Sequence, residues 1–418
     1  MSKYIINGGK KINGEVHISG AKNATLGILA ASIMTDEDII IENIPDVWDV
    51  NVMLDAIKIL GANVNRIDRN TVKINSKNAN NTELLDTNLG KMRATYYFVG
   101  ALLAKHKKAK VRIPGGCNIG ARPINLHLKG FNALGAEAYE KDDCLIATAD
   151  NLVGANIYLD VVSVGATVNI MLAAVLSLGV TIIDNAAKEP HVVDIANFLN
   201  SMGANIKGAG TDTIRIKGVK KLHGTTYAVI PDQIEAGTYM TLASITKGDI
   251  TIKNIIPRHL ESISAKLLDI GNQVILYDEA LRVIGSDIMY PTTVKTMPYP
   301  GFPTDMQPQF ACTLTLAKGK SQVNESIFEN RFKYVDEIKK MGANIEVDGQ
   351  IINITGVDKL YGCKMEAPDL RAGAALVLAS LAANGKSEID RIEYVERGYE
   401  DFVNKLKLLG ADIEKVEE

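Results

Sequence analysis

The sequence predicts an α/β fold in which two domains are each built from three copies of one repeat. The repeat shows in a Leu-Gly-Ala motif, or a close variant, that ends an amphipathic segment six times at intervals of roughly 70 residues. The chain also begins with a strand-like stretch at 4–7, whereas the sixth repeat stops before its last strand. The motif glycines are Gly61, Gly135, Gly203, Gly271, Gly342 and Gly410.

Each repeat contains the same elements in the same order. A helix of apolar and small residues, as at 22–34, is followed by a short β-branched run such as 39–41. A second helix ends at the motif glycine, which suits the left-handed cap position. Two alternating segments follow, for example 344–347 and 351–354 around Asp348-Gly349, and these indicate a hairpin. Together the elements predict a β-α-β-α-β-β unit.

The two ends of the chain are expected to form one repeat together. The sixth repeat ends with a strand at 411–416, so the stretch at 4–7 would supply its missing partner. The domains would then be 22–230, and 1–21 together with 231–418. The chain would cross between them twice, which favours a hinged pair over independent domains.

Composition indicates a cytoplasmic globular enzyme. Of 418 residues, 46% are hydrophobic and 23% charged, and the net charge of -3 argues against a general nucleic-acid binder. The apolar stretch 166–183 contains Asn169 and other polar residues, so we expect a core segment and no membrane association. The cysteines lack Cys-x-x-Cys spacing and the six histidines are scattered, so no metal site is predicted.

The starts of the first helices carry polar residues with two possible roles. The acidic ones, at 232, 305 and 369, fit the capping of free N–H groups. The cations do not, because a positive charge at the positive end of a helix is disfavoured unless an anion lies between them. Other residues at these starts include Lys22, Asn23, Arg93, Ser163, Val164, Gly165, Thr304 and Arg371.

Arginines also precede several of the second helices. If the pseudo-symmetry directs these ends to the cleft between the domains, their guanidinium groups would converge on a phosphate or carboxylate. The alternative is a set of solvated surface arginines, which is the ordinary condition of a single arginine. The residues concerned are Arg122, Arg258, Arg331 and Arg397, with Glu189 at the equivalent position of the third repeat.

The second repeat departs most from the pattern, in the loop 112–123. Three glycines and two prolines exclude a regular helix there. Cys117 lies between Arg112 and Arg122, in a positive field that favours thiolate, so it is a candidate acid or nucleophile. The alternative for a free cysteine is a small buried apolar residue, which we expect for Cys312 and also for Cys144 and Cys363.

Five motifs in order resemble the UDP-N-acetylglucosamine 1-carboxyvinyltransferase family of enolpyruvyl transferases, over the whole chain. They are Gly20-Ala21-Lys22-Asn23-Ala24, Pro114-Gly115-Gly116-Cys117-x-Ile119-Gly120-Ala121-Arg122-Pro123, Phe302-Pro303-Thr304-Asp305-Met306-Gln307, Phe328-Glu329-Asn330-Arg331-Phe332 and Asp369-Leu370-Arg371-Ala372. The resemblance implies a two-domain inside-out α/β barrel, pseudo-threefold in each domain, with the active site in the inter-domain cleft. It also implies transfer of enolpyruvate from phosphoenolpyruvate to the sugar 3-hydroxyl, in peptidoglycan synthesis, without metal or organic cofactor.

The resemblance further implies the roles of individual residues. Cys117 would be the acid, able to form a covalent adduct and to be alkylated by fosfomycin, and Asp305 would be the base or sugar-hydroxyl partner. Phosphoenolpyruvate would be bound by Lys22, Asn23, Arg122, Arg371 and Arg397, of which Lys22 and Arg397 also count as catalytic. The UDP-sugar would contact Asn23, Arg93, Arg122, Pro123, Ile124, Asn125, Leu126, Ser163, Val164, Gly165, Asp305 and Ile327.

Two other functions compete with this one. The sister transferase acting on shikimate 3-phosphate shares the repeat but has no cysteine loop like 114–123. A ring-shaped clamp built of such repeats would bind DNA and would need a basic inner face. Trp48, in an expected loop, and Val161 both stand where lysine can occur in the family, and they bear on substrate affinity.

Overall fold

The computed structural model describes residues 2–86, 89, 92–113 and 123–417. Within these, the chain divides into two compact units, each with its own hydrophobic core. We call the one drawn from 20–230 the central unit, and the one drawn from 1–19 and 231–418 the terminal unit. Cys117 and Arg122 lie outside the described residues, so the structure places neither of them.

Six four-stranded sheets, three in each unit, share one topology among the described residues. In each sheet an edge strand pairs in parallel with the strand that follows the first helix of a repeat, this strand pairs antiparallel with the second hairpin strand, and the second hairpin strand pairs antiparallel with the first. In two sheets the parallel edge strand is exchanged, since β14 (Thr225–Ala228) pairs with β3 (Asp38–Glu42) and β2 (Asn13–His17) pairs with β15 (Asp249–Lys253). This order confirms the predicted β-α-β-α-β-β unit. The central sheets are β14 (Thr225–Ala228), β3 (Asp38–Glu42), β5 (Thr71–Asn75), β4 (Asn63–Asp68); β6 (Glu83–Leu84), β7 (Lys108–Arg112), β9 (Cys144–Thr148), β8 (Glu137–Lys141); and β10 (Asn156–Tyr158), β11 (Val180–Asp184), β13 (Thr213–Lys217), β12 (Asn205–Lys207).

The terminal unit contains the two chain ends in one sheet. Strand β1 lies between β23 and β24, with Tyr4 opposite Ile389 on one side and Lys415 on the other. This confirms that the N-terminal stretch completes the sixth repeat. The terminal sheets are β2 (Asn13–His17), β15 (Asp249–Lys253), β17 (Ala280–Ile284), β16 (Gln273–Leu276); β18 (Thr293–Lys295), β19 (Lys320–Asn324), β21 (Ile351–Thr355), β20 (Asn344–Asp348); and β22 (Lys364–Glu366), β23 (Lys386–Asp390), β1 (Ser2–Asn7), β24 (Asp412–Glu417).

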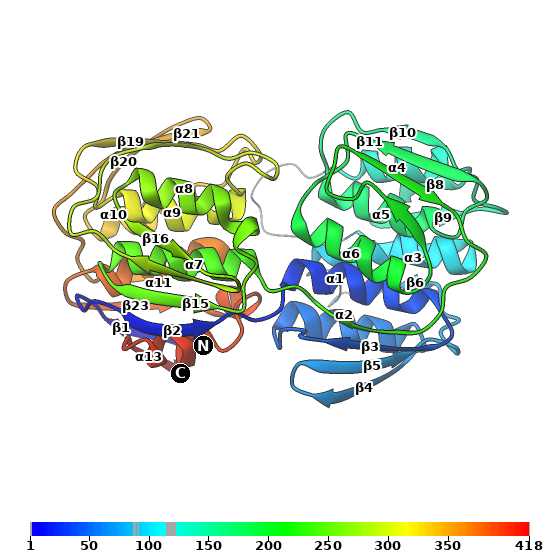
Figure 1. Cartoon of the computed structure of the whole chain (residues 1–418), viewed down its shortest axis with the longest axis horizontal. Helices are drawn as coiled ribbons and strands as arrows, with labels where there is room; N and C mark the ends of the chain where they lie inside the picture. The colour runs from blue at the N-terminus through cyan, green and yellow to red at the C-terminus, as the bar shows by residue number, and fades with distance from the viewer. Residues whose placement is uncertain (1, 87–88, 90–91, 114–122, 418) are drawn as a thin grey trace. The chain divides into compact units, whose positions relative to one another are not determined.

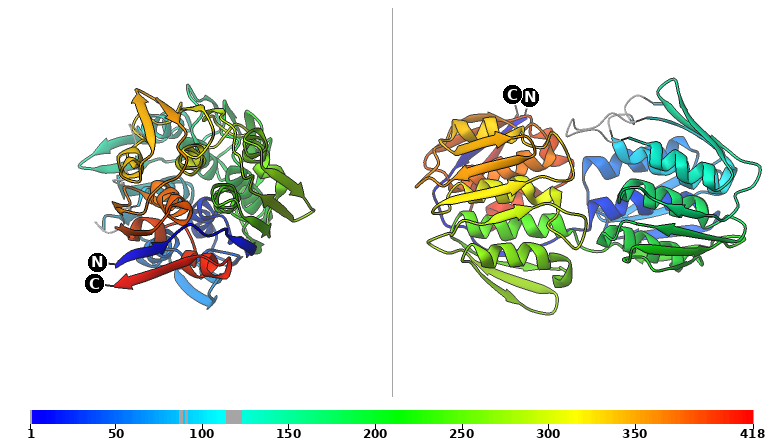
Figure 2. Two further views of the ribbon diagram at one scale, coloured as in Figure 1. Left: turned by 90° about the vertical axis from the view of Figure 1, so that its left-hand side faces the viewer. Right: turned by 90° about the horizontal axis from the view of Figure 1, so that it is seen from above.

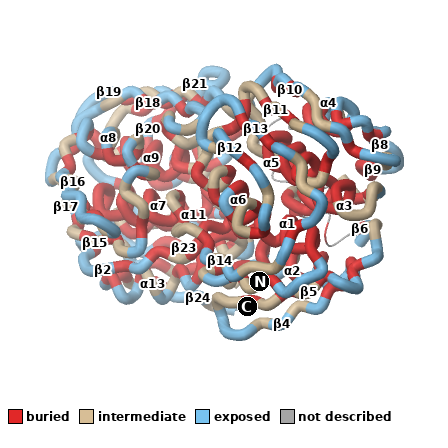
Figure 3. Tube along the Cα trace, turned by 45° about the vertical axis from the view of Figure 1, so that its right-hand side comes forward, coloured by how far each residue is buried: buried red, intermediate tan, exposed pale blue. Residues whose placement is uncertain are grey.

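The first helix of each repeat is enclosed within its unit. Nearly every residue of these helices is buried, and sheets and second helices surround them (Figures 1 and 3). For this reason they show little amphipathic pattern. They consist mainly of small and apolar residues, with some fully buried polar residues such as Thr238, Gln307 and Gln309. They are α1 (Lys22–Ala31), α3 (Tyr97–His106) and α5 (Val164–Ala174) in the central unit, and α7 (Gln233–Ile245), α9 (Gln307–Leu314) and α11 (Leu370–Ala382) in the terminal unit.

The second helices pack between these inner helices and the strands of their own unit (Figure 2). Each unit is therefore an inside-out barrel, helices within and sheets outside, as the resemblance implies. The second helices are α2 (Trp48–Ile59), α4 (Asn125–Ala133), α6 (Pro190–Ser201), α8 (Glu261–Asp269), α10 (Tyr334–Lys340), α12 (Glu393–Glu396) and α13 (Phe402–Leu408). Short 3₁₀ turns are η1 (Ser32–Met34), η3 (Arg93–Tyr96), η4 (Pro257–Leu260) and η5 (Thr304–Met306).

The six motif glycines end these second helices in the left-handed conformation. Their φ angles run from +88° at Gly135 to +100° at Gly61. A residue with a Cβ is strained there, which explains why the motif keeps glycine. Gly349, also at positive φ, turns the chain between β20 and β21, which confirms the hairpin expected around it.

The apolar stretch 166–183 forms most of α5 and the strand β11 inside the central unit, as expected of a core segment. Among the described residues, no helix is long and apolar enough to cross a membrane.

Candidate active site

Asp305 lies between two buried arginines of the terminal unit. Its Oδ1 accepts a hydrogen bond from Arg331 Nη2 at 2.7 Å, and its Oδ2 accepts from Arg371 Nε at 3.2 Å and lies 3.1 Å from Arg371 Nη2. The two arginine side chains are only 5% and 3% exposed, whereas that of Asp305 is 28% exposed. The two arginines are thus buried, whereas the Asp305 carboxylate that they bind is partly exposed to solvent.

Some guanidinium donors in this cluster remain available. Within the described part of the chain, Arg331 Nε and Arg371 Nη1 are buried and make no hydrogen bond. Arg371 also lies over the Tyr399 ring, 5.3 Å from its centroid, and this contact fixes the plane of the guanidinium. Buried, unsatisfied charged donors are costly, and an anion arriving at the cluster would satisfy them.

Of the three acidic residues at helix starts, two cap their helices and the third does not. Asp232 Oδ1 accepts from Ile234 N and Glu235 N, so Asp232 caps α7. Asp369 caps α11 in the same way, which confirms the capping alternative for both residues. Asp305 makes no cap bond to η5 or α9 and bonds the arginines instead. Capping is therefore the wrong interpretation for Asp305.

A fully buried carboxylate, Glu325, is linked by hydrogen bonds to the cluster of Asp305, Arg331 and Arg371. Its Oε1 accepts from Thr296 Oγ1 and from the backbone N–H groups of residues 327 and 328, and its Oε2 accepts from Thr304 Oγ1 at 2.8 Å. Thr304 Oγ1 in turn accepts from Arg331 Nη1 at 2.8 Å. Ile327, a predicted UDP-sugar residue, is thereby tied to the turn that carries Asp305.

Lys22 opens α1 in the central unit and is paired inside the protein. Its Nζ lies 3.1 Å from Asp49 Oδ2, and the side chains are 9% and 6% exposed. Asp49 comes from the first turn of α2, and it supplies an anion that helps to compensate a cation at a helix start. Trp48, expected in a loop, is instead the first residue of α2 and is 40% exposed. Asn23 follows in α1, half-buried.

The other predicted residues of the central unit lie at the starts of η3, α4 and α5. Arg93 opens η3, half-buried, with its guanidinium carbon 5.6 Å from the centroid of the Tyr96 ring. Ser163 caps α5 by accepting from Ala166 N at 3.3 Å, and Val164 and Gly165 form its half-buried first turn. The residues at the start of α4 range from exposed (Pro123, Asn125) through half-buried (Ile124) to buried (Leu126).

Arg397 and the remaining cysteines complete the placement of the predicted residues. Arg397 is half-buried at the end of α12, in the terminal unit. Cys312 and Cys144 are buried, as expected, and burial raises the pKa of the Cys312 thiol far above its ordinary range. The same expectation for Cys363 is wrong, because this side chain is only half-buried.

Three polar residues that bond to site residues were not predicted from the sequence as parts of the site. Glu325 and Asp49 were not predicted, Thr304 was expected only among the helix-start residues, and Arg331 was expected only as one of a group of cations. Thr304 and Arg331 stand inside the quoted motifs, whereas Glu325 shows only as an acid after a β-branched run and Asp49 only as an acid in a helix start.

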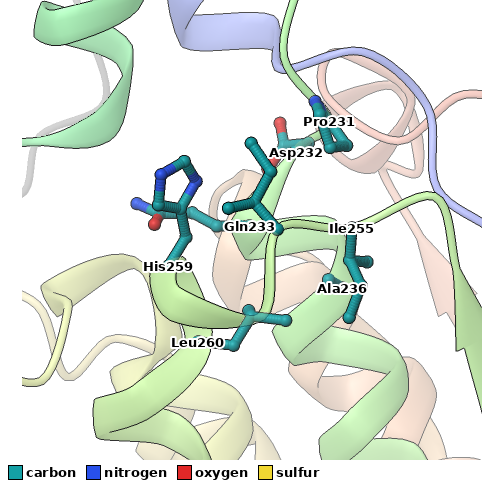
Figure 4. Close-up of a pocket in the computed structure, with 8 residues that line it drawn as sticks. Pro231, Asp232, Gln233, Ala236, Ile255, His259 and Leu260 are labelled. Carbon is teal, nitrogen blue, oxygen red and sulfur yellow. The ribbon is translucent and has the colours of Figure 1, made fainter. Parts of the chain in front are cut away.

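A small hollow beside Asp232 does not compete as a ligand site. It is lined by residues from the start of α7 and from η4, including Gln233 and His259, and has practically no enclosed volume (Figure 4). Pockets for drug-sized ligands enclose about 300–1,000 Å³, so this space is too small for a nucleotide sugar. The described residues include no group of three His, Cys, Asp or Glu side chains suited to a metal ion.

Comparisons with known proteins cover the whole chain. Residues 6–406 match the family model described as EPSP synthase (3-phosphoshikimate 1-carboxyvinyltransferase). A Clostridium acetobutylicum protein named UDP-N-acetylglucosamine 1-carboxyvinyltransferase 2 is 54% identical over 416 residues, covering 99% of both chains. The UDP-N-acetylglucosamine 1-carboxyvinyltransferase of Clostridium botulinum is 53% identical over 414 residues, again 99% of both.

Solved structures agree on the fold. The enolpyruvyl transferase NikO from Streptomyces tendae superposes with a TM-score of 0.89 at 25% identity, covering 99% of this chain and 98% of NikO. EPSP synthase from Acinetobacter baumannii superposes with a TM-score of 0.78 at 18% identity, covering all of both chains. At that identity the second likeness bears on the fold alone.

Proposed function

Because the chain belongs to the EPSP synthase family, we propose that it transfers the enolpyruvyl group of phosphoenolpyruvate to the 3-hydroxyl of UDP-N-acetylglucosamine. The observation that carries the proposal is identity of 54% and 53%, over 99% of both chains, with two proteins that bear this activity in their names. The product would be a precursor of peptidoglycan, made in the cytoplasm. The sister activity on shikimate 3-phosphate has support only from the name of the family model and from structures of low identity.

The proposed reaction is an addition followed by an elimination. A base removes the proton of the sugar 3-hydroxyl, whose oxygen then bonds to C2 of phosphoenolpyruvate while an acid adds a proton to C3. In the second stage C3 gives up a proton and the C2–O bond to phosphate breaks, which restores the double bond and releases inorganic phosphate. Cys117 is our candidate acid for C3, and Asp305 is our candidate base or hydroxyl partner.

The terminal unit suits the anionic half of this chemistry. Arg371, with Arg331 added by the structure, brings buried donors to Asp305, and some of these make no bond among the described residues. Such preplaced cations would stabilise the charge that develops at the carboxylate and phosphate of the intermediate. Lys22, Arg122 and Arg397 would share the binding of phosphoenolpyruvate, with Asn23 where that pocket meets the sugar.

The central unit suits the UDP half. The first turn of α5, at Ser163, Val164 and Gly165, is a helix N-terminus, which offers backbone donors to a diphosphate. Arg93 adds a cation, and Arg122 to Leu126 would enclose the nucleoside. Asp305 and Ile327 would complete the sugar contacts.

The test is phosphate release from phosphoenolpyruvate, with and without UDP-N-acetylglucosamine. Shikimate 3-phosphate serves as the competing acceptor, and Cys117→Ala as the variant. We expect release that requires the UDP-sugar and is lost in the variant. Release only with shikimate 3-phosphate would assign the sister activity, and no release with either acceptor, together with DNA binding at low salt, would favour the clamp.

A further inference from the structure

The interior of α5 contains an amide in apolar surroundings. Asn169 has no exposed surface, and its neighbours Val168 and Ile170 are equally buried. A buried amide costs about 1–3 kcal/mol when it is left without hydrogen bonds, so its partners must be accounted for. They lie on other elements, all in the central unit.

Asn169 makes three hydrogen bonds to three segments. Its Oδ1 accepts from Gly100 N in α3 at 2.9 Å, and its Nδ2 donates to Tyr96 O in η3 at 2.9 Å and lies 3.0 Å from His127 Nδ1 in α4. A backbone N–H only donates and a carbonyl only accepts, so these two contacts fix the orientation of the amide. The second hydrogen of Nδ2 therefore points to His127 Nδ1, and the imidazole proton is on Nε2.

His127 is held as a neutral acceptor. Burial, aided by the charge of Arg93, lowers the pKa of His127 to about 3, so the ring is uncharged at neutral pH. A charged ring would carry a proton on Nδ1 and would oppose the Asn169 donor. The bond between the two side chains therefore persists across the working pH range of an ordinary enzyme.

Close packing transmits this arrangement to the start of α5. The rings of Tyr96 and His127 meet edge to face with their centroids 4.8 Å apart. A Cβ placed on Gly165 would lie 2.4 Å from the Tyr96 hydroxyl and 3.1 Å from His127 Cε1. Gly165 is thus in direct contact with both rings. Helix α3 approaches α5 equally closely, since a Cβ on Gly100 would lie 2.4 Å from the backbone carbonyl oxygen of Asn169.

We propose that Asn169 is a positioning residue for the nucleoside-diphosphate sugar. Its partners lie on η3, which begins at Arg93, and on α4, which follows Ile124, while its own helix begins at the Ser163 cap. One amide therefore sets the relative positions of the three elements that carry the proposed UDP-sugar contacts of this unit. The inference rests on the proposed function and adds a residue that needs no contact with substrate.

The test compares Asn169→Leu with a matched variant on the same helix. Leucine keeps the branched shape, with two methyl groups in place of the amide oxygen and nitrogen, and removes all three bonds. Thr167→Val is the control, because Thr167 is also fully buried and its Oγ1 accepts from Ala187 N at 3.0 Å, on a segment with none of the proposed ligand residues. His127→Phe is the second test variant, since it keeps a flat aromatic ring and removes the Nδ1 acceptor together with the Nε2–H group.

Steady-state kinetics provide the first measurement. We expect Asn169→Leu to raise KM for UDP-N-acetylglucosamine about 10-fold to 100-fold while KM for phosphoenolpyruvate changes less than about 3-fold. His127→Phe should give a smaller selective rise, and Thr167→Val none. Equal rises in both KM values, or the same selective rise in Thr167→Val, would overturn the proposal.

Amide hydrogen exchange provides a measurement that does not depend on the reaction. In Asn169→Leu, exchange should quicken in the segments 92–100, 124–130 and 163–169 of the free protein and remain unchanged in the terminal unit. If the wild-type protein used another acceptor, the proposed function would fail while this exchange pattern still tested the positioning role. Unchanged exchange in all three segments would refute that role.

Discussion

Replacing Glu325 with glutamine tests whether the network behind Asp305 sets the activity. Glutamine can keep an oxygen at the position of Oε1, where it still accepts from Thr296 and from the N–H groups of 327 and 328. At the position of Oε2 it places an amide NH₂ opposite Thr304 Oγ1, which already accepts from Arg331. The Thr304 hydroxyl hydrogen then loses its acceptor, while the hydroxyl oxygen accepts from both Arg331 and the new amide.

The expected fall in kcat/KM follows from the loss of this one hydrogen bond. A hydrogen bond to a charged acceptor contributes about 1.5–3 kcal/mol, so disturbing the one between Thr304 and Glu325 should loosen Arg331 by a comparable amount. If that loss is felt in the transition state, kcat/KM falls about 10-fold to 100-fold. The fold should survive, because the three bonds at Oε1 remain.

The assay is kcat/KM for phosphate release, measured beside urea unfolding of each variant. Thr304→Ser keeps the hydroxyl and should behave as the wild type, whereas Thr304→Val should lower kcat/KM as Glu325→Gln does. If Glu325→Gln retained wild-type kcat/KM, or if serine and valine at 304 were indistinguishable, the argued link from Glu325 through Thr304 to Arg331 would be wrong.

Three further expectations follow from the site and its surroundings. Fosfomycin should inactivate the wild-type protein with a mass increase on the peptide containing Cys117, and Cys117→Ala, which is expected to be inactive, should show no mass increase on the corresponding peptide. Asp49→Asn should raise KM for phosphoenolpyruvate about 10-fold, since it removes the carboxylate 3.1 Å from Lys22 Nζ, and an unchanged KM in steady-state kinetics would refute that role. Burial raises the pKa of Glu235 from 4.5 to about 7, with the Lys405 ammonium offsetting part of the rise. The folded protein therefore holds this proton more tightly than the unfolded chain does. The resulting contribution to the free energy of unfolding, about 3 kcal/mol, is present below pH 4.5 and is lost as the pH rises to about 7. Chemical unfolding of Glu235→Gln should therefore show a flatter pH dependence in that interval.

The fold was predictable because its determinants are local and repeated. A glycine that must adopt positive φ, as at Gly61 or Gly342, marks a helix end wherever it recurs, and alternation around Gly349 marks a hairpin. Even the completion of the sixth repeat by β1 followed from counting strands.

The partners of the site residues were not predictable in the same way. Asp305 and Asp369 occupy equivalent helix starts, and only the structure shows that one bonds arginines while the other caps its helix. The difference depends on Arg331 and Arg371, which reach the same carboxylate from separate repeats. A helix-start pattern carries no information on such long-range pairing.

The role of Asn169 was visible in the sequence only in part, as a polar residue within an apolar helix. A polar residue in an apolar inner helix argued against a membrane span, and the same residue proves to be bonded to three other elements. Glu325 is the corresponding case in the terminal unit, a fully buried polar side chain that accepts from two consecutive backbone N–H groups. Each bonds backbone groups of segments that carry proposed ligand residues, and so holds those segments from the buried side. Other inner helices also bury polar side chains, such as Gln307 and Gln309 in α9, which bond to Tyr334 and Thr238. Because the partners differ from helix to helix, such buried polar contacts are one means by which repeats of the same pattern acquire different surfaces.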